Sequence, residues 1–364
     1  MKRILILSTG GTIASMPTED GLVPSLTGEQ MTEMMPELKQ IGKLECRQVC
    51  NLDSTNMQPE RWVELAGIIR EGYEKYDGVV ILHGTDTMAY TASALSFLLQ
   101  DVPLPVMLTG SQIAMGEEKS DAKSNIMQAV QAAVDGKPGV YIVFAGKIIK
   151  GVRAKKMCTR NFVAFSSINE EPAGEVTQGR VIWNPATTEN PETPGNHKVT
   201  GNSETVENPE TVGNSENSLR EQKTIAGFNT NIAILKLYPG MDEKMLSLII
   251  DGNCDGIIIE AFGCGGVPNA GRNLLPQIER ATKKGIPVVI TTQCIYDGVN
   301  LDVYEVGVLA KRLGVLSGRD MTIEALTAKL MWVLGQTSEP GEISDMMDRC
   351  YVGEFSRRTK RYQT

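Results

Sequence analysis

Short apolar runs with strand character alternate with stretches of helix length along the first half of this chain. The runs are rich in Ile, Val and Leu and occupy residues 4–7, 79–82, 106–108 and 140–144. Helix-like stretches separate them, including residues 59–73 and 120–134. This alternation predicts a mainly parallel β-sheet with helices on both faces, because parallel strands need a crossover connection that a helix usually provides. In such a sheet, ligands bind beyond the carboxyl ends of the strands.

The same alternation resumes after residue 228. Strand-like runs occupy residues 232–237, 256–260 and 287–292, and helix-like stretches occupy residues 243–250 and 273–284. A chain of 364 residues exceeds what one hydrophobic core usually serves. We therefore expect an α/β fold with a larger N-terminal domain over residues 1–184 and a smaller C-terminal α/β domain over residues 227–364.

Residues 185–226, between the two expected domains, have a different composition. They are rich in Asn, Thr, Glu, Pro and Gly, contain few large apolar residues, and repeat one pattern at 189–196 and 207–214. Such a segment cannot bury enough apolar surface to offset the entropy lost on ordering. We expect a disordered linker expanded by duplication, since two polar copies are too few for a solenoid. This position also removes His197 from consideration as a catalytic group.

Composition narrows the class of partner. A net charge of −8 argues against nucleic acid, whose phosphates require clustered Lys and Arg, so a small-molecule substrate fits better. No run approaches the roughly 18 apolar residues of a membrane span. Residues 4–8, which follow a basic start, are too short for the core of a signal peptide. These features predict a cytoplasmic protein with no membrane partner.

The sequence indicates neither a metal nor a cofactor site. The seven cysteines include no C-x-x-C pair, and His83 and His197 are the only histidines, so neither a zinc site nor a disulfide framework is predicted. The pair Gly10 and Gly11 could suggest a phosphate cradle. However, neither G-x-x-x-x-G-K-[ST] nor G-x-G-x-x-G surrounds that pair.

Two threonine motifs carry most of the chemical information. Thr12 follows Gly10 and Gly11 after the first strand-like run, and Thr85 follows Gly84 after a later run. Glycines free the backbone of such turns and can place a hydroxyl beside exposed backbone N–H groups. This arrangement suits a nucleophile next to an oxyanion site. We therefore predict an active site with paired hydroxyl groups.

A threonine hydroxyl needs a proton acceptor before it can act as a nucleophile at neutral pH. His83 could be that base, but a histidine at the end of an apolar run can equally be a hydrogen-bonded structural residue. A partly buried lysine could do the same work. Asp86 could hold such a lysine or bind a substrate ammonium group, or it could form a turn or cap a helix. The residues alone leave these alternatives open.

The segment Thr-Gly-Gly-Thr-Ile-Ala-Ser at 9–15, followed by His-Gly-Thr-Asp-Thr-Met at 83–88, resembles the two signatures of the bacterial-type L-asparaginase family. Further similarity covers residues 51–57, 106–112, 151–169 and 289–299. Residues 292–294 and 299–300 look closer to the cytoplasmic type I enzymes than to the secreted type II enzymes. The resemblance implies a larger N-terminal and a smaller C-terminal α/β domain, assembled as a homodimer or homotetramer.

The resemblance also implies a role for each matching residue of the two signatures and of the segment that begins at Gly151. Thr12 would be the nucleophile. Lys156 would assist proton transfer through Thr85, and Asp86 would hold the α-amino group of the substrate. Lys155 is the alternative to Lys156, because the two lysines are adjacent.

Five further residues match positions that bind substrate in this family. Ser54 and Thr55 would grip the α-carboxylate. Gly84 and Ser111 would line the pocket with backbone groups that face the amide oxygen, and Gly11 belongs to the same substrate-binding set. Without the resemblance, Ser54 and Ser111 would read as ordinary turn serines.

Residues and resemblance together predict an L-asparaginase, which hydrolyses the side-chain amide of L-asparagine to L-aspartate and ammonia. Thr12 would attack the amide carbon, backbone donors would hold the oxyanion, and water would hydrolyse the acyl-threonine intermediate without a cofactor. The chain departs from the family in the loop after the first signature. Leu22 stands where well-known members carry a tyrosine, so another group, such as water, would have to activate Thr12.

Two alternatives accompany this prediction. The chain could be the ammonia-supplying subunit of a tRNA-dependent amidotransferase, which shares both signatures. In that subunit a further domain normally precedes the first signature, whereas Thr12 lies close to the start of this sequence. The chain could also be a catalytically idle amino-acid sensor, as Leu22 suggests. The presence of Thr12, Thr85 and Lys156 favours the enzyme, since a pure binder needs neither both hydroxyls nor the lysine.

Overall fold

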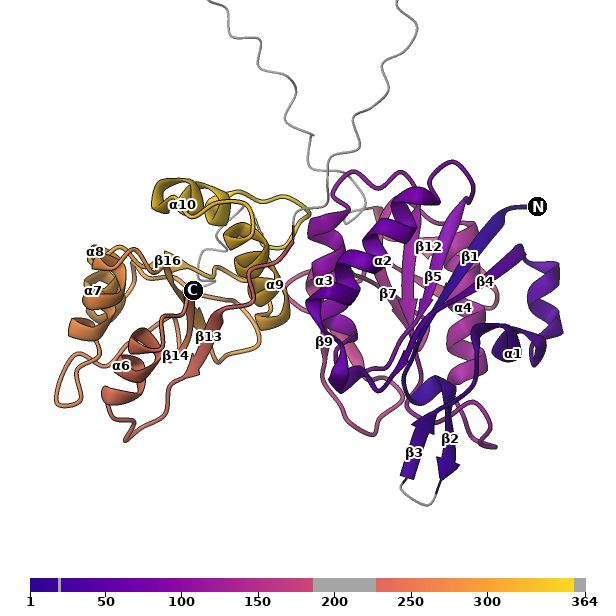
Figure 1. Cartoon of the computed structure of the whole chain (residues 1–364), viewed down its shortest axis with the longest axis horizontal. Helices are drawn as coiled ribbons and strands as arrows, with labels where there is room; N and C mark the ends of the chain where they lie inside the picture. The colour runs from indigo at the N-terminus through magenta and orange to yellow at the C-terminus, as the bar shows by residue number, and fades with distance from the viewer. Residues whose placement is uncertain (19–20, 186–226, 357–364) are drawn as a thin grey trace, which may run out of the picture.

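A computed structural model describes residues 1–18, 21–185 and 227–356 of the chain. Two α/β domains lie side by side, and helices α3 (Met88–Leu98) and α9 (Ile323–Leu334) face each other where the domains meet (Figure 1). The expected linker lies outside the described residues except for Pro185, and His197 lies outside them as well.

The larger domain is built on one eight-stranded sheet. Its strands, in order across the sheet, are β12 (Arg180–Trp183), β11 (Gly174–Thr177), β8 (Lys147–Lys150), β7 (Gly139–Phe144), β6 (Pro105–Thr109), β5 (Gly78–Leu82), β1 (Arg3–Gly10) and β4 (Lys43–Leu52). The strands from β7 to β4 are parallel, whereas β8, β11 and β12 continue the sheet in antiparallel pairing. The predicted mainly parallel sheet is confirmed, with an antiparallel extension on one side.

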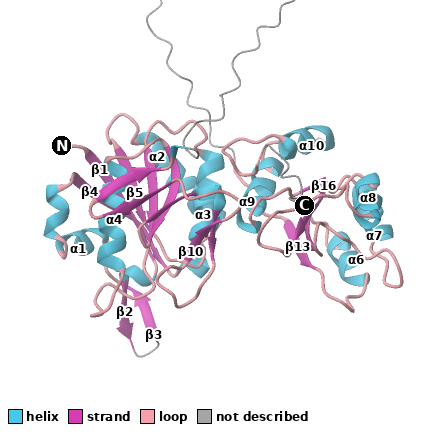
Figure 2. Cartoon of the chain, turned by 180° about the vertical axis from the view of Figure 1, so that it is seen from behind, coloured by secondary structure: helices cyan, strands magenta, loops and turns pink. Residues whose placement is uncertain are grey.

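Helices cover both faces of this sheet (Figure 2). They are α2 (Pro59–Glu71) and α3 on one face, and α1 (Gly28–Glu33) and α4 (Ala122–Val134) on the other. Leu5 and Leu7 of β1 belong to the core under α2 and α3, whereas Ile4 and Ile6 belong to the core under α1 and α4. Successive side chains of a strand point to opposite faces. A strand covered on both faces is therefore apolar throughout, which explains the continuous runs in the sequence.

Short elements at the edges of the sheet complete the larger domain. They are η1 (Thr12–Ala14), β2 (Ser15–Thr18), β3 (Gly21–Pro24), η2 (Pro36–Gln40), η3 (Ser54–Asn56), η4 (Gly151–Arg153), β9 (Ala154–Lys156) and β10 (Phe165–Ser167). Strands β2 and β3 pair in antiparallel fashion and project from the body of the domain, directly after the first threonine motif (Figure 1). Leu22 belongs to β3, and its side chain lies outside the described part of the structure.

The smaller domain contains a four-stranded parallel sheet. Its strands are β13 (Ile232–Lys236), β14 (Gly256–Ala261), β15 (Val288–Thr292) and β16 (Leu316–Ser317). Helices α6 (Lys244–Asp251), α7 (Leu275–Lys283) and α8 (Glu305–Arg312) share one core with this sheet, and α9 and α10 (Pro340–Asp348) pack on the other side. Within the described residues, no helix has both the length and the apolar character needed to cross a membrane.

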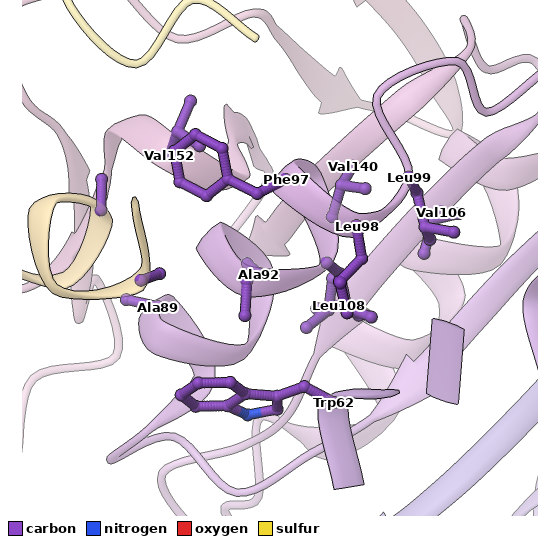
Figure 3. Close-up of a cluster of buried hydrophobic side chains, with 14 of the residues drawn as sticks. Trp62, Ala89, Ala92, Phe97, Leu98, Leu99, Val106, Leu108, Val140 and Val152 are labelled. Carbon is purple, nitrogen blue, oxygen red and sulfur yellow. The ribbon is translucent and has the colours of Figure 1, made fainter. Parts of the chain in front are cut away.

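One continuous apolar core joins the two domains through α3. Ten of its eleven residues are buried, because the sheet lies on one side and α9 on the other. Phe97 of α3 stacks on Trp332 of α9, with ring centroids 5.7 Å apart. Small side chains such as Ala89 and Ala92 leave room for close helix packing (Figure 3). The helix that follows the second threonine motif is therefore fixed by both domains.

Candidate active site

The sheet brings the two threonine motifs together. Strands β1 and β5 are parallel neighbours, so their carboxyl ends lie at the same edge. Strand β1 ends at Gly10 and Thr12 begins η1, while β5 ends at Leu82 shortly before Thr85. Both motifs therefore lie where ligands bind in α/β sheets.

Glycines allow the two motif turns to touch. Gly10 and Gly11 have φ values of +101° and +82°, which side chains disfavour. A Cβ on Gly11 would lie 2.3 Å from the Cα of Gly84, and a Cβ on Gly84 would lie 2.6 Å from Cβ and Oγ of Ser54. The two motifs and the segment that begins at Ser54 thus meet with no room for another methyl group.

Lys156 holds the second motif by two hydrogen bonds. Its Nζ donates to Thr85 Oγ1 at 2.7 Å and to Asp86 Oδ1 at 2.6 Å. The Lys156 side chain is 17% exposed, whereas the Asp86 side chain is 56% exposed and accessible to a ligand. The side chain of Lys155 points to the other side of β9 and forms an ion pair with Glu324 of α9 at 3.0 Å. The geometry therefore places Lys156, and not Lys155, beside Thr85.

Gln112 also contacts Thr85, although the sequence analysis did not single it out. Its Nε2 donates to the carbonyl oxygen of Asn161 at 3.0 Å, which turns Oε1 toward the Thr85 hydroxyl at 3.5 Å. The backbone N–H of Gln112 donates to Asp121, which fixes this turn. The position of Gln112 just beyond β6, the strand next to β5, is the sequence signal that could have found it.

The segment from Asp53 to Thr55 packs against the second motif. Thr87 donates a hydrogen bond from Oγ1 to the carbonyl oxygen of Ser54 at 2.7 Å. Asp53 accepts hydrogen bonds from the backbone N–H and the hydroxyl of Thr55, at 2.8 and 2.7 Å. Ser54 is buried and Thr55 is exposed. The segment therefore forms a fixed wall beside Thr85 and Asp86.

The other predicted site residues with hydroxyl groups, Ser111 and Thr12, differ in the hydrogen bonding of those groups. Ser111 is buried, and its hydroxyl donates to the carbonyl oxygen of Ile113 at 2.6 Å, so the side chain fastens its own turn. Thr12 is half-buried, and across the described residues its hydroxyl has no hydrogen-bond partner. The close approach of Gly11 and Gly84 places the turn that carries Thr12 beside the Thr85 turn.

The surroundings of His83 are those of a buried, hydrogen-bonded structural residue. Its Nδ1 lies 2.7 Å from the carbonyl oxygen of Gly84, so this nitrogen carries the proton that is donated to that carbonyl. The Thr91 hydroxyl then donates to Nε2 at 3.0 Å and accepts from the indole N–H of Trp62 at 3.0 Å. Burial lowers the pKa of His83 to about 4. With both ring nitrogens engaged, His83 orients the Gly84 turn and is not placed to accept a proton from Thr12.

Fold and site define a two-domain α/β protein with a threonine, lysine and aspartate cluster at the carboxyl edge of its larger sheet. The family model "Asparaginase, N-terminal" matches residues 3–189, and "Glutaminase/Asparaginase C-terminal domain" matches residues 231–347. The chain belongs to the asparaginase family. The resemblance inferred from the two signatures is thereby confirmed.

Similar proteins span nearly the whole chain. An L-asparaginase from Thermococcus kodakarensis is 38% identical, over 97% of this chain and 99% of its own length. A solved structure of the thermostable L-asparaginase from that organism has a TM-score of 0.80 at 37% identity, covering 97% of this chain and 99% of the other. L-asparaginase I from Vibrio cholerae has a TM-score of 0.77 at 29% identity, covering 98% and 99%. A subunit of the glutamyl-tRNA(Gln) amidotransferase from Methanobrevibacter smithii is 36% identical, over 98% of this chain and 78% of its own length.

Proposed function

We propose that this protein is an L-asparaginase that hydrolyses L-asparagine to L-aspartate and ammonia. The observation that carries the proposal is the position of Lys156, whose Nζ lies 2.7 Å from the Thr85 hydroxyl and 2.6 Å from Asp86. A lysine beside a hydroxyl can take up and return a proton within one hydrogen bond. The similarity to an L-asparaginase over 97% of the chain supports the same activity.

Asp86, Ser54 and Thr55 bind the amino-acid end of the substrate in this proposal. The half-exposed carboxylate of Asp86 receives the α-ammonium group, which it attracts by charge. Ser54 and Thr55, on the wall beside Asp86, receive the α-carboxylate. These contacts direct the side-chain amide toward the two threonines.

Thr12 is the nucleophile. Its hydroxyl oxygen bonds to the amide carbon while its proton passes to an acceptor, such as water. The carbonyl oxygen becomes an oxyanion, which backbone N–H groups beside the motif turns would stabilise. The carbon–nitrogen bond then breaks, and the nitrogen leaves as ammonia after gaining a proton. The product of this half-reaction is an ester between aspartate and Thr12.

Thr85 and Lys156 serve the proton transfers. Lys156 Nζ contacts the Thr85 hydroxyl, so the free-amine form of the lysine can accept a proton that passes from a water molecule through Thr85. The activated water attacks the ester carbon, and the Thr12 oxygen leaves and regains a proton. We propose no metal or cofactor for these steps.

Ammonia release by the purified chain tests the proposal. We expect release from asparagine, a lower rate from glutamine, and loss of both in Thr12→Ala and Lys156→Met. Thr12→Ser is the matched control, because it restores a hydroxyl at the same position and should retain part of the rate. A rate that survives Thr12→Ala would refute the assignment of the nucleophile.

The same experiment separates the two alternatives. Release from glutamine but not from asparagine would indicate the amidotransferase subunit, and one such subunit is 36% identical to this chain. Binding of asparagine by calorimetry without any release would indicate a sensor. The net charge of −8 supports the free enzyme over a tRNA-dependent one, because tRNA phosphates favour a basic surface.

We also propose a cytoplasmic homodimer or homotetramer. No disulfide joins cysteines in the part of the chain that the structure describes, which suits a reducing compartment. The smaller domain exposes several large apolar side chains, among them Tyr238, Leu248, Tyr296 and Tyr304, which are 52–66% exposed and favour self-association. Sedimentation velocity tests the assembly, and a monomer at micromolar concentration would contradict it.

A further inference from the structure

Strand β9 lies between the proposed active site and the smaller domain. It pairs with β10 in antiparallel register, with Lys156 opposite Phe165 and Lys155 opposite Ser166. Because successive side chains of a strand point to opposite sides, Lys156 and Lys155 leave β9 in opposite directions. Lys156 contacts Thr85 in its own domain, and Lys155 contacts Glu324 in the other domain.

The ion pair between Lys155 and Glu324 is largely buried. Lys155 Nζ donates to Glu324 Oε1 at 3.0 Å, and the two side chains are 25% and 10% exposed. Glu324 lies in the first turn of α9, where the helix favours a negative charge. Its second oxygen is buried and has no hydrogen-bond partner in the part of the chain that the structure describes. A carboxylate in this environment depends strongly on its one lysine partner.

A second buried ion pair fastens the same segment to the smaller domain. Arg153, just before β9, is 3% exposed and donates to Asp320 Oδ2 at 3.2 Å and to the carbonyl oxygen of Gly353 at 2.9 Å. Asp320 also accepts hydrogen bonds from the backbone N–H and the hydroxyl of Ser356, at 2.8 and 2.6 Å. Arg153 and Lys155 thus connect both sides of Ala154 to the smaller domain.

These contacts bear on the position of the Lys156 ammonium group. A lysine side chain is long and flexible, so its Nζ stays within hydrogen-bond distance of Thr85 only if its backbone is held in place. We propose that Glu324 and Asp320 of the smaller domain are positioning residues, which act through Lys155 and Arg153 to keep Lys156 at Thr85. This inference rests on the proposed function. The smaller domain would then contribute to catalysis within its own subunit.

Steady-state kinetics with asparagine tests the inference. Lys155→Met and Glu324→Gln remove one side each of the ion pair and keep similar volume. We expect each to lower kcat about 10-fold or more while KM stays within about 2-fold, because displacement by about 1 Å affects proton transfer more than substrate binding. The double variant should be no slower than either single variant, since both remove the same interaction.

Two control variants distinguish an effect on the position of Lys156 from a general weakening of the contact between the domains. Lys155→Arg keeps the charge and should retain the wild-type kcat. Lys75→Met removes an exposed ion pair with Glu45, at the far edge of the sheet, and should change neither kcat nor KM. Thermal unfolding is measured for every variant, so that kcat is compared per folded molecule.

The outcomes are distinct. An unchanged kcat in Lys155→Met and Glu324→Gln, with or without a lower melting temperature, would overturn the positioning role and leave the proposed function intact. A wild-type protein that releases no ammonia from asparagine would instead overturn the proposed function. Should Glu324→Gln fail to fold, Lys155→Met decides alone, because Lys155 is the more exposed partner.

Discussion

His83 makes a sharp prediction about stability in acid. Its imidazole is fully buried, and its two nitrogens bond to the Gly84 carbonyl and the Thr91 hydroxyl. A proton on Nε2 would oppose the hydrogen that Thr91 donates there and would place a charge in an apolar site. The folded protein therefore resists protonation of His83, and its pKa falls to about 4.

The stability change follows from this pKa. The unfolded chain protonates His83 near pH 6.5, whereas the folded chain does so only near pH 4. Since the unfolded state gains the proton first, the contribution of His83 to stability is complete above about pH 6.5 and is lost as the pH falls toward 4. The difference between a pKa of 6.5 in the unfolded chain and about 4 in the folded chain corresponds to about 3 kcal/mol in the free energy of unfolding, at about 1.4 kcal/mol per pH unit.

Two measurements check this value. The imidazole resonances of histidine labelled with 13C give the pKa directly, because the chain has only two histidines and His197→Gln assigns the pair. Urea unfolding of the wild type and of His83→Asn gives the free energies. Asparagine does not titrate, so the stability difference between the two proteins should shrink by about 3 kcal/mol between pH 7 and pH 4.

A His83 resonance that titrates near 6.5 would refute the argument. So would a stability difference between wild type and His83→Asn that is constant across this pH range. Either result would mean that the buried hydrogen bonds of His83 do not disfavour its charged form.

Three other substitutions have expected outcomes. Gly84→Ala would place a Cβ 2.6 Å from Ser54, and we expect kcat/KM for asparagine to fall about 100-fold because the motif turn must move. Lys329→Met leaves the fully buried Glu354 without its ion-pair partner at 2.8 Å, and should cost about 3–5 kcal/mol in urea unfolding. Trp332→Ala removes a ring from the core shared by the two domains and should cost about 3–5 kcal/mol in the same assay. Wild-type values in any of these measurements would contradict the packing described.

Much of the fold follows from local sequence. The central strands β1, β5, β6 and β7 are continuous apolar runs because both of their faces are covered, and these runs were predicted. The antiparallel strands β8, β11 and β12 were not predicted. Each has only four residues, and their pairing is set by contacts with β7 and with each other. Periodicity over so few residues does not distinguish a strand from a loop.

The candidate site shows a similar division. Thr12 and Thr85 lie in glycine-rich turns that the sequence displays, so their neighbourhood was predictable. Gln112 and Glu324 were missed because each reaches Thr85 or β9 from a distant part of the chain. The position of Gln112 just beyond an expected strand is the one available signal, and no local pattern marks Glu324. The assignment of Lys156 depended on family resemblance, since two adjacent lysines otherwise read as surface charges.

Helix α3 makes the geometry of the candidate active site depend on the contact between the two domains. The second threonine motif runs directly into this helix, and ten of its eleven residues are buried between one domain's sheet and the other domain's α9. Separating the domains would expose that helix to water and release the turn that holds Thr85 and Asp86. Heat inactivation of this protein should therefore coincide with domain separation. The activity that remains after heating should equal the fraction of subunits in which the two domains are still packed together.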